Sequence, residues 1–545
     1  MKNFLVVISL LCCGALCARA QQTTVSGTLT SAQGSPISIA HVHVMGTDSY
    51  KAKPQSFSAD DKGHFSFSLP NGWYRVQFSG VDYAAAPERP MEIYCCGQPV
   101  EINAQLAANA IAGTIDSVKI ITDLTQYDFT KAVTMKKQSD GTFTADFTTS
   151  KPTLSYQVLV FGGESQGEHS VNGTMSDSYE YDGGGDYRSI VNVKNGAVNI
   201  IFDPKKAPSV KGAGKVEFTD DFSKSVKAIL SQEDADNQVF FKAYGMRKAG
   251  KPITYNPKEA HEKVRKDIAA ETNPILREIQ MLRYLQVGYF SEDTTGVDVG
   301  YVKEIIAAIP AFSSVWGHHP QLVGAAMNFL KDKKYDYAKQ VLKENASVYV
   351  KSEVLSSLLE RATNEKDDKV AATYYTQLMK EYPDTYAARN AEKRFNPNRK
   401  IKEGNIIPNF AFDGVDEESG KKITPASLKG KWVLIDNWAT WCGPCVAEMP
   451  ALHSVYEKFK NKNFVVLSVS FDRQAADVTK FRGGKFKMPW MHSFSEGVWE
   501  SEAAKVFEVT GIPKPILIDP KGKIVAMEEE LRSENLEKTL AKYVK

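Results

Sequence analysis

The sequence has little net charge, because 67 lysines and arginines nearly balance 65 aspartates and glutamates and leave a formal charge of +2 at pH 7. Such a balance gives no reason to expect a nucleic acid or an anionic membrane surface as a partner. At 545 residues the chain is too long for one hydrophobic core. A prior of roughly 150 residues per domain therefore predicts three or four domains.

Long apolar runs are lacking after the first segment, since no later stretch approaches the roughly 20 apolar residues that a helix needs to cross a bilayer. Residues 1–20 have the pattern of a signal peptide, with Lys2, an apolar run over 4–11, and Ala18-Arg19-Ala20 as a small-x-small cleavage site. We therefore expect an exported protein of the periplasm or cell envelope, with no transmembrane segment after signal removal. Lipid attachment is less favoured, because a poor lipoprotein cleavage site precedes each of Cys12, Cys13 and Cys17.

Cysteine is scarce: of seven in the chain, only Cys95, Cys96, Cys442 and Cys445 follow the predicted signal peptide. Four cysteines are too few for a scaffold held together by disulfides. Neighbouring side chains of a strand point to opposite faces, so Cys95 and Cys96 are expected to be one core cysteine and one exposed cysteine. A vicinal disulfide, or a regulatory partner for Cys442, is the alternative.

Residues 21–108 have the period of two that is typical of strands. A turn at 70–72 separates two alternating runs and predicts a hairpin of half-buried strands. The apolar positions of this hairpin are Phe65, Phe67 and Leu69 before the turn and Tyr74, Val76 and Phe78 after it. With the patterns at 25–27, 36–44 and 60–63, this segment resembles the carboxypeptidase regulatory-like β-sandwich. Such modules serve as spacers, docking units or sugar-binding domains, so the resemblance implies a fold and no particular function.

Residues 109–208 are again strand-like, most clearly at 118–121 and 156–160, and predict a second β-sandwich.

Residues 215–395 are helical in pattern. A core-facing stripe at three- and four-residue steps is formed by Ile275, Ile279, Leu282 and Leu285. Segments 337–344 and 374–381 look alike and suggest tetratricopeptide-like hairpins. A plain helical bundle is an equal alternative.

The most informative motif is Trp-Ala-Thr-Trp-Cys-Gly-Pro-Cys at residues 438–445, which follows an apolar run at 432–436. The pattern predicts a buried strand that leads into the first turn of a helix. Backbone N–H groups and the helix dipole favour a thiolate there. Two cysteines at this spacing can exchange a dithiol for a disulfide with little backbone movement, which is the minimum equipment for thiol–disulfide exchange.

Residues 401–545 resemble the thioredoxin superfamily, and within it the exported TlpA/ResA-type thiol–disulfide oxidoreductases. The motif at 438–445, Glu448, Pro450 and residues 511–513 carry the resemblance, with 408–410 and 428–431 in agreement. The predicted fold class is therefore multidomain: a signal peptide over 1–20, two all-β sandwiches over 21–108 and 109–208, a helical domain over 215–395, and an α/β thioredoxin fold over 401–545.

Each sulfur can be given a role. Cys442, at the helix N-terminus and expected to be the more exposed sulfur, should attack the partner protein, and Cys445 should resolve the mixed disulfide. Cys445 must then lose its proton, for which Asp436 and Glu448 are the candidate bases. The resemblance implies that Pro513 is a cis-proline beside the disulfide. It also implies substrate binding by Trp441, Gly443, Pro444, Ile512 and Pro513.

Other interpretations of these residues are weaker. Asp436 alone could be a structural residue at a strand end, Glu448 a solvated helix residue, and the cysteine pair an inert disulfide. Half a zinc site would need further ligands, which His453 and His492 do not supply as a motif. A peroxidase would need proline at Ile435 and Thr or Ser at Ala439. We therefore expect no metal and no cofactor.

Two histidine pairs stand elsewhere in the chain, His41 with His43 and His318 with His319. Neither pair has carboxylate or cysteine companions nearby in sequence, so both are expected to be structural.

The Gly-Pro dipeptide between the cysteines is that of thioredoxin, whose reduction potential is near −270 mV against about −120 mV for DsbA. The sequence thus predicts a reductase of protein disulfides, or an isomerase-like role, with recycling by an upstream membrane or periplasmic electron donor. The resemblance suggests cytochrome c maturation as one pathway, because ResA-type proteins reduce the haem-binding cysteines of the apocytochrome. A thiol oxidant is a weak alternative. Another is a cell-envelope scaffold whose residues 21–400 bind a carbohydrate or protein.

Overall fold

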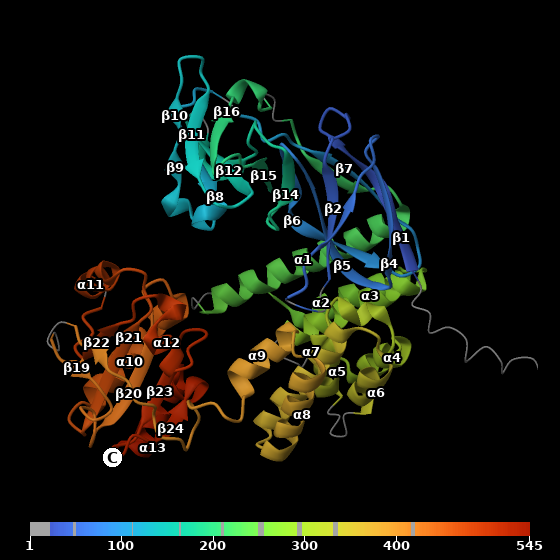
Figure 1. Cartoon of the computed structure of the whole chain (residues 1–545). Helices are drawn as coiled ribbons and strands as arrows, with labels where there is room; N and C mark the ends of the chain where they lie inside the picture. The colour runs from blue at the N-terminus through green and yellow to red at the C-terminus, as the bar shows by residue number, and fades with distance from the viewer. Residues whose placement is uncertain are drawn as a thin grey trace, which may run out of the picture. The chain divides into compact units, whose positions relative to one another are not determined.

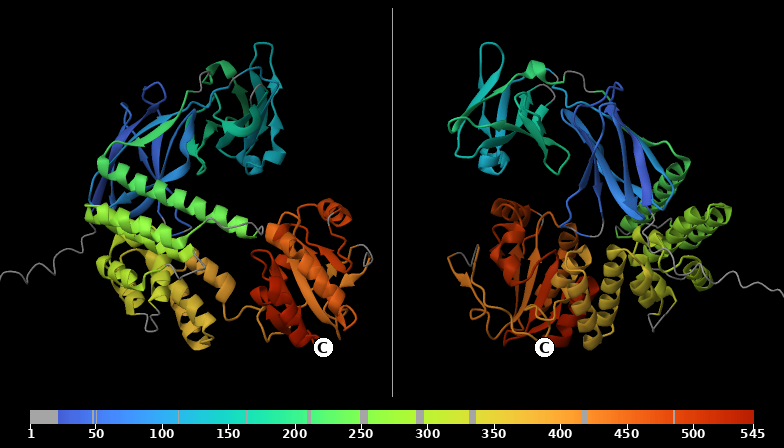
Figure 2. Two further views of the ribbon diagram at one scale, coloured as in Figure 1. Left: turned by 180° about the vertical axis from the view of Figure 1, so that it is seen from behind. Right: turned by 45° about the vertical axis from the view of Figure 1, so that its right-hand side comes forward.

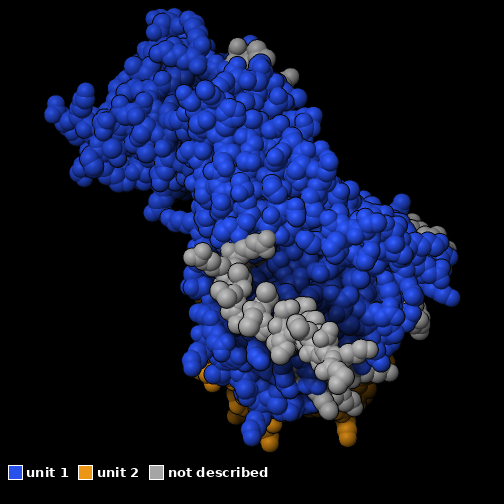
Figure 3. Space-filling view, turned by 90° about the vertical axis from the view of Figure 1, so that its right-hand side faces the viewer, with its two compact units in different colours: residues 1–388 blue, residues 389–545 orange. Residues whose placement is uncertain are grey.

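The computed structural model describes residues 22–46, 49, 51–111, 113–162, 165–208, 212–248, 255–290, 297–330, 336–415, 420–484 and 486–545. The predicted signal peptide lies outside these residues. The chain divides into two compact units, Met1–Ala388 and Arg389–Lys545, which Figure 3 shows in different colours. Among the described residues, no helix is long and apolar enough to cross a membrane.

A first β-sandwich follows residue 21, as the period of two predicts (Figure 1). One sheet has the order β17-β7-β1-β4 and the other β3-β2-β5-β6. The strands are β1 (Gln22–Ser31), β2 (Ala40–Met45), β3 (Gln55–Ser58), β4 (His64–Pro70), β5 (Gly72–Gly80), β6 (Tyr83–Cys95), β7 (Val100–Leu106) and β17 (Lys215–Phe218). Val25, Phe78 and Ile102 are fully buried between the two sheets.

The predicted hairpin is wrong in its pairing. Strands form on both sides of the turn, but β4 pairs with β1 and β5 pairs with β2 and β6, so the two lie in opposite sheets. Phe67 and Phe78 belong to one core cluster. An alternating pattern reports only that one face of each strand is buried, and this holds equally for two strands of one sheet and for two that face each other.

A second β-sandwich occupies the next hundred residues, with sheet orders β10-β11-β16 and β14-β15-β12-β8-β9, and with β13 paired to β12. Its strands are β8 (Ser117–Thr122), β9 (Val133–Thr134), β10 (Lys136–Lys137), β11 (Phe143–Thr148), β12 (Thr153–Gly162), β13 (Ser165–Val171), β14 (Ser178–Tyr181), β15 (Tyr187–Asn192) and β16 (Ala197–Phe202). The two clearest predicted strands are β8 and β12, which pair antiparallel.

The helical region begins with α1 (Asp221–Lys248), which packs along β6 and β7 of the first sandwich (Figure 2). The helices that follow are α2 (Pro257–Ala270), α3 (Pro274–Phe290), α4 (Val299–Ala308), α5 (Gln321–Phe329), α6 (Asp336–Glu344), α7 (Val348–Asn364), α8 (Asp368–Glu381) and α9 (Tyr386–Phe395). The predicted stripe lies on α3, where Ile279, Leu282 and Leu285 are buried. The tetratricopeptide-like nature of α6 and α8 stays a prediction.

Sandwich and helices share one hydrophobic cluster. Trp73 of β5 and Tyr94 of β6 are buried with Trp316 of the short helix η5 (Ser314–Gly317). The Tyr94 hydroxyl is 2.8 Å from the hydroxyl oxygen of Ser314. Burial of apolar surface stabilises such a contact by roughly 25 cal/mol per Å². The shared cluster therefore helps to hold the helical region against the first sandwich.

The second unit is an α/β fold around a sheet of order β22-β21-β20-β23-β24. Its strands are β18 (Phe412–Asp413), β19 (Lys422–Ile423), β20 (Trp432–Trp438), β21 (Phe464–Ser470), β22 (Met491–Phe494), β23 (Lys514–Ile518) and β24 (Ile524–Met527). Its helices are α10 (Gly443–Phe459), α11 (Ala475–Gly484), α12 (Glu502–Val506) and α13 (Ser533–Tyr543). β20 is parallel to β21 and antiparallel to β23. The predicted fold class is confirmed.

Candidate active site

The cysteine pair stands where the central strand β20 leads into α10. From Val433 to Trp438, β20 is buried. Cys442 is the N-cap of α10, and its sulfur accepts the backbone N–H of Cys445 at 3.2 Å. Pro444 lies in the first turn of the helix, where a missing N–H leaves no helical bond unmade. The strand thus delivers Cys442 to the positive end of the helix dipole.

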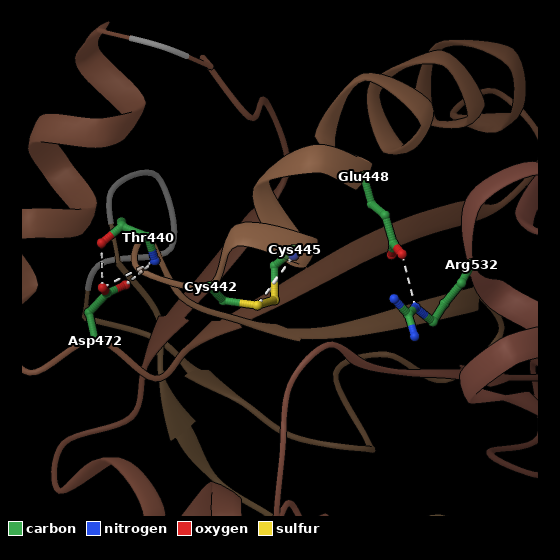
Figure 4. The surroundings of a disulfide bond; sticks show 6 residues. All are labelled: Thr440, Cys442, Cys445, Glu448, Asp472 and Arg532. Carbon is green, nitrogen blue, oxygen red and sulfur yellow. Dashed lines mark hydrogen bonds and ion pairs between the residues drawn. A yellow bond between two sulfur atoms is a disulfide. The ribbon is translucent and has the colours of Figure 1, made fainter. Parts of the chain in front are cut away.

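Cys442 and Cys445 form a disulfide, with their Cα atoms 5.3 Å apart (Figure 4). Cys442 is 5% exposed and Cys445 3%, so the expected difference in exposure is slight. The exposed surface around them is made by Trp441, Gly443 and Pro444.

Asp436 lies on the central strand β20 and is 9% exposed. Burial raises its pKa to about 7, although a hydrogen bond donated by the Ser468 hydroxyl opposes the rise and the charge of Glu448 adds to it. The Ser468 oxygen is 3.0 Å from Oδ2 of Asp436. Near neutral pH this carboxyl can therefore either accept or donate a proton.

Glu448 projects from α10 and is not a solvated helix residue, because its side chain is only 20% exposed. Arg532, just before α13, donates from Nε to Oε1 of Glu448 at 2.9 Å (Figure 4). The same guanidinium donates from Nη1 to Glu529 at 2.8 Å. The sequence pattern does not point to Arg532, because this residue lies outside the cysteine motif and only the fold brings it to Glu448.

A cavity of about 20 Å³ joins these groups. Asp436, Cys445, Glu448 and Pro513 line it, with apolar side chains around them. A volume of this size has room for about one water molecule. The structure therefore gathers both candidate bases around the cysteine that must lose its proton.

Asp472 is a second residue that sequence reasoning missed. It is 1% exposed and follows β21. Its carboxylate accepts both the backbone N–H of Thr440, at 3.1 Å, and the Thr440 hydroxyl, at 2.6 Å. Ser470 donates to the same carboxylate at 2.8 Å. The bonds between Thr440 and Asp472, which Figure 4 shows, fix the short segment between β20 and α10.

Of the remaining predicted residues, Pro513 is half-buried and lines the same cavity as Cys445. The peptide bond between Ile512 and Pro513 is cis, as the resemblance implies. Trp441 is 54% exposed and Trp499 43%, and their ring centroids are 6.1 Å apart. α10 continues through Pro450 to Phe459.

The cysteines outside the redox motif, and the pair of His41 and His43, lie among other side chains of the first unit. Cys95 and Cys96 are free thiols; Cys95 is fully buried in the sandwich core, while Cys96 is half-buried against the helical cluster rather than exposed. Burial raises the pKa of Cys95 to about 12. His41 contacts the Tyr187 hydroxyl at 2.7 Å, and His43 contacts two serine hydroxyls, which agrees with the expected structural role.

For His318 and His319 the structure adds partners that their sequence neighbourhood does not contain. No carboxylate stands near them in sequence, but the fold places Glu233 beside both rings and Glu92 beside His318.

A disulfide at the start of the helix that follows the central strand of this α/β sheet defines a thioredoxin-like thiol–disulfide oxidoreductase. Two family models match the chain: the AhpC/TSA family over residues 404–527, and the carboxypeptidase regulatory-like domain over residues 24–107. Both resemblances drawn from the sequence are confirmed.

Curated relatives agree with this class. The chain is 30% identical over 151 residues to the thiol-disulfide oxidoreductase ResA of Bacillus cereus, which is 28% of this chain and 82% of the relative. It is also 30% identical over 132 residues to ResA of Bacillus subtilis, which is 24% and 69% of the two chains. The solved thioredoxin domain of a thiol-disulfide oxidoreductase from Bacteroides vulgatus is 32% identical, covering 27% of this chain and 99% of that one with a TM-score of 0.25. The chain thus belongs to the ResA family of thiol–disulfide oxidoreductases. The peroxidase alternative is not favoured.

Proposed function

We propose that this protein is an exported reductase of protein disulfides that acts through a cycle of Cys442 and Cys445. The observation that carries the proposal is a disulfide at a helix N-terminus with a buried carboxyl of pKa about 7 lining the same cavity as Cys445. The Gly-Pro dipeptide between the cysteines supports the reducing direction, because thioredoxin has the same dipeptide and a potential near −270 mV.

The cycle starts from the dithiol. The Cys442 thiolate attacks one sulfur of the substrate disulfide, so that a mixed disulfide forms and the other substrate sulfur leaves as a thiolate, which takes up a proton. Cys445 then loses its proton and attacks the Cys442 sulfur. This step forms the Cys442–Cys445 disulfide and releases the second substrate thiol. The substrate gains two electrons and two protons, and an upstream dithiol donor restores the enzyme.

Asp436 is the proposed acceptor of the Cys445 proton. A group with a pKa near the working pH is ionised often enough to accept the proton and still basic enough to hold it. The cavity of about 20 Å³ gives room for a water molecule between the carboxyl and the thiol. Glu448, held by Arg532, keeps a negative charge nearby that favours protonation of Asp436.

Substrate docking is proposed on the exposed surface beside Cys442. Trp441, Gly443 and Pro444 are exposed there, and Ile512 and Pro513 are half-buried. Backbone groups beside Pro513 would pair with an extended segment of the substrate, as in strand addition. Tight docking would hold the substrate sulfur in line with Cys442.

Trapping of the mixed disulfide tests this proposal. The Cys445→Ser variant cannot resolve, so it should accumulate as a mixed disulfide with a disulfide-containing substrate such as insulin, and dithiothreitol should release it. Cys442→Ser should trap nothing. Adducts of equal yield with both variants would contradict the assigned order of attack.

The proposed compartment and pathway have separate tests. Export predicts that the mature chain in a cell fraction starts at Gln21, which N-terminal sequencing would show. Reduction of apocytochrome c predicts that Cys445→Ser captures the oxidised apoprotein in preference to insulin. Equal capture of both would argue for a general reductase instead.

A further inference from the structure

A second cluster of reactive side chains lies in the first unit. Glu233 comes from α1, and His318 and His319 follow η5 directly. Nε2 of His318 is 3.3 Å from Oε2 of Glu233, and Nε2 of His319 is 2.6 Å from Oε1. Each residue offers one ligand atom, and these atoms all lie within 4.8 Å of one another. Two imidazoles thus turn the same ring nitrogen toward the two oxygens of one carboxylate.

The opposite nitrogen of each ring has its own partner. Nδ1 of His318 is 3.3 Å from Oε2 of Glu92, and Nδ1 of His319 is 3.3 Å from the Gln321 amide nitrogen. Glu92 can accept the Nδ1 proton, and a half-turn of the Gln321 amide brings its oxygen there to accept the other. With the protons on Nδ1, both Nε2 atoms carry lone pairs. Metal-bound histidines are held by outer carboxylates and carbonyl groups in this way.

The cluster of Glu233, His318 and His319 is largely buried, and burial makes a positive partner for the carboxylate necessary. The side chains of Glu233 and His318 are 7% and 8% exposed, and that of His319 is 18% exposed. The Trp73 ring stacks on His318 with centroids 4.6 Å apart. An ionised carboxylate in such surroundings needs a positive partner.

The cluster also has an approach route. Glu233, His318 and His319 line a cleft of about 830 Å³, whose wall includes Lys227 and Gln286. A metal held by three side chains would keep a further position for water from this cleft, as three-ligand zinc sites do.

We propose that Glu233, His318 and His319 bind a divalent cation of the zinc class, with Glu92 and Gln321 orienting the two rings. Two imidazoles and one carboxylate suit zinc and its neighbours among the transition metals, whereas calcium and magnesium prefer all-oxygen sites. Bound there, the ion would join α1 to the segment after η5 and, through Glu92, to β6 of the sandwich.

The competing account is an ion pair without a metal. Although burial opposes it, hydrogen bonds to Glu233 and Glu92 raise the pKa of His318 to about 9, so that a protonated His318 could bridge the two carboxylates. The two accounts differ in what they predict for added metal.

The test uses the full chain without a histidine tag, in a Cys442→Ser/Cys445→Ser background that removes the redox thiols as ligands. After dialysis against a chelator, Zn²⁺ is titrated by calorimetry and the bound metal is counted by mass spectrometry. We expect about one Zn²⁺ per chain. Co²⁺ in its place should give visible bands of nitrogen and oxygen ligation without the near-ultraviolet band of thiolate ligation, which excludes Cys95 and Cys96.

Variants assign the ligands. Glu233→Gln and His319→Ala should lose the stoichiometric binding, and Glu92→Gln should weaken it about 10- to 100-fold, as outer partners of metal ligands do. Glu353→Gln is the matched control, because this half-buried carboxyl of α7 lines a pocket with His318 and Glu92 but offers no atom to the ligand group, and the variant should bind as the parent does. No binding of Zn²⁺ by the folded parent chain, or binding that Glu233→Gln leaves unchanged, would overturn the proposal.

Discussion

Asp436 in the second unit and Glu233 in the first are both buried carboxyls, yet their pKa values are shifted in opposite directions. Asp436 has a serine hydroxyl as its hydrogen-bond donor, and burial raises its pKa to about 7. Burial acts on Glu233 in the same direction, but in the metal-free protein hydrogen bonds donated by His318 and His319 outweigh it and hold its pKa far below the ordinary value. One carboxyl holds a proton near neutral pH, and the other stays an anion.

This difference shows what burial alone does and what a partner adds. Burial raises the pKa of a carboxyl that has no cation beside it, so the group can take up and release a proton near neutral pH. A carboxyl between two imidazoles stays charged and can serve as a ligand. Glu448, which forms an ion pair with Arg532, is an intermediate case, because it is a half-buried carboxylate beside a guanidinium.

The largest expected effect is on stability. A pKa raised from 3.8 to about 7 means that the folded state binds more protons than the unfolded one between these values, so Asp436 reduces stability as pH rises through this window. At roughly 1.4 kcal/mol per pKa unit the full loss is about 4 kcal/mol. Asp436→Asn should therefore stabilise the second unit at pH 8 by up to about 4 kcal/mol and hardly at all at pH 4. Urea denaturation of the oxidised protein at both pH values measures this; equal gains at both would contradict it.

The opposite sign is expected for Glu233. Glu233→Gln removes the anion that two imidazoles surround, and breaking a buried pair destabilises proteins by about 3–5 kcal/mol. The first unit should then unfold at a lower temperature while the thermal transition of the second unit stays in place. Calorimetry that resolves the two transitions is the measurement, with Glu353→Gln as the control. A first unit that is stabilised by Glu233→Gln would contradict the proposed contrast between Glu233 and Asp436.

The next largest effect is expected on the catalytic rate when Asp436 is replaced. Loss of a general base typically lowers a rate about 100-fold or more. Asp436→Asn should therefore slow the reduction of insulin at pH 7 by about 100-fold, and the deficit should shrink at high pH, where the Cys445 thiol ionises unaided. Asp477→Asn, an exposed carboxyl of α11, is the control and should keep the parent rate. A constant deficit across pH would argue for a structural role instead.

Much of the redox site could be predicted because it is local in sequence. Strand, cysteines, Glu448 and Pro513 all belong to short motifs whose spacing carries meaning. Arg532 could not be found in this way, since it lies 84 residues from Glu448 and only the packing of α13 brings it close.

The misjudged features also depend on distant partners. Glu233 is 85 residues from His318, so the histidine pair had no visible carboxylate. The strands β4 and β5 adjoin in sequence, but which sheet each joins is decided by β1 and β2. An alternating pattern fixes the buried face of a strand and leaves its neighbours open.

A smaller effect is expected at Arg532. Arg532→Ala leaves Glu448 without its guanidinium, and a half-buried pair of this kind contributes about 1 kcal/mol, or about fivefold in a rate. The reduction rate should fall by about that factor, and Arg532→Lys should recover part of it. In a Glu448→Gln background the same change should do little. An undiminished effect in that background would show that Arg532 acts elsewhere.

The smallest effect is expected at Ser468, whose hydrogen bond lowers the pKa of Asp436. Ser468→Ala should raise that pKa by about 0.5–1 units, in line with one hydrogen bond. The acid limb of the pH–rate profile should move upward by the same amount. A limb that does not move would show that Asp436 is not the titrating base.

The reduction potential of the Cys442–Cys445 pair tests the proposed function most directly. Thiol trapping in defined redox buffers, in a Cys95→Ser/Cys96→Ser background, isolates this pair from the other thiols. A reductase should give a value near or below roughly −220 mV. A value near roughly −120 mV would contradict the account and make the protein an oxidant of thiols.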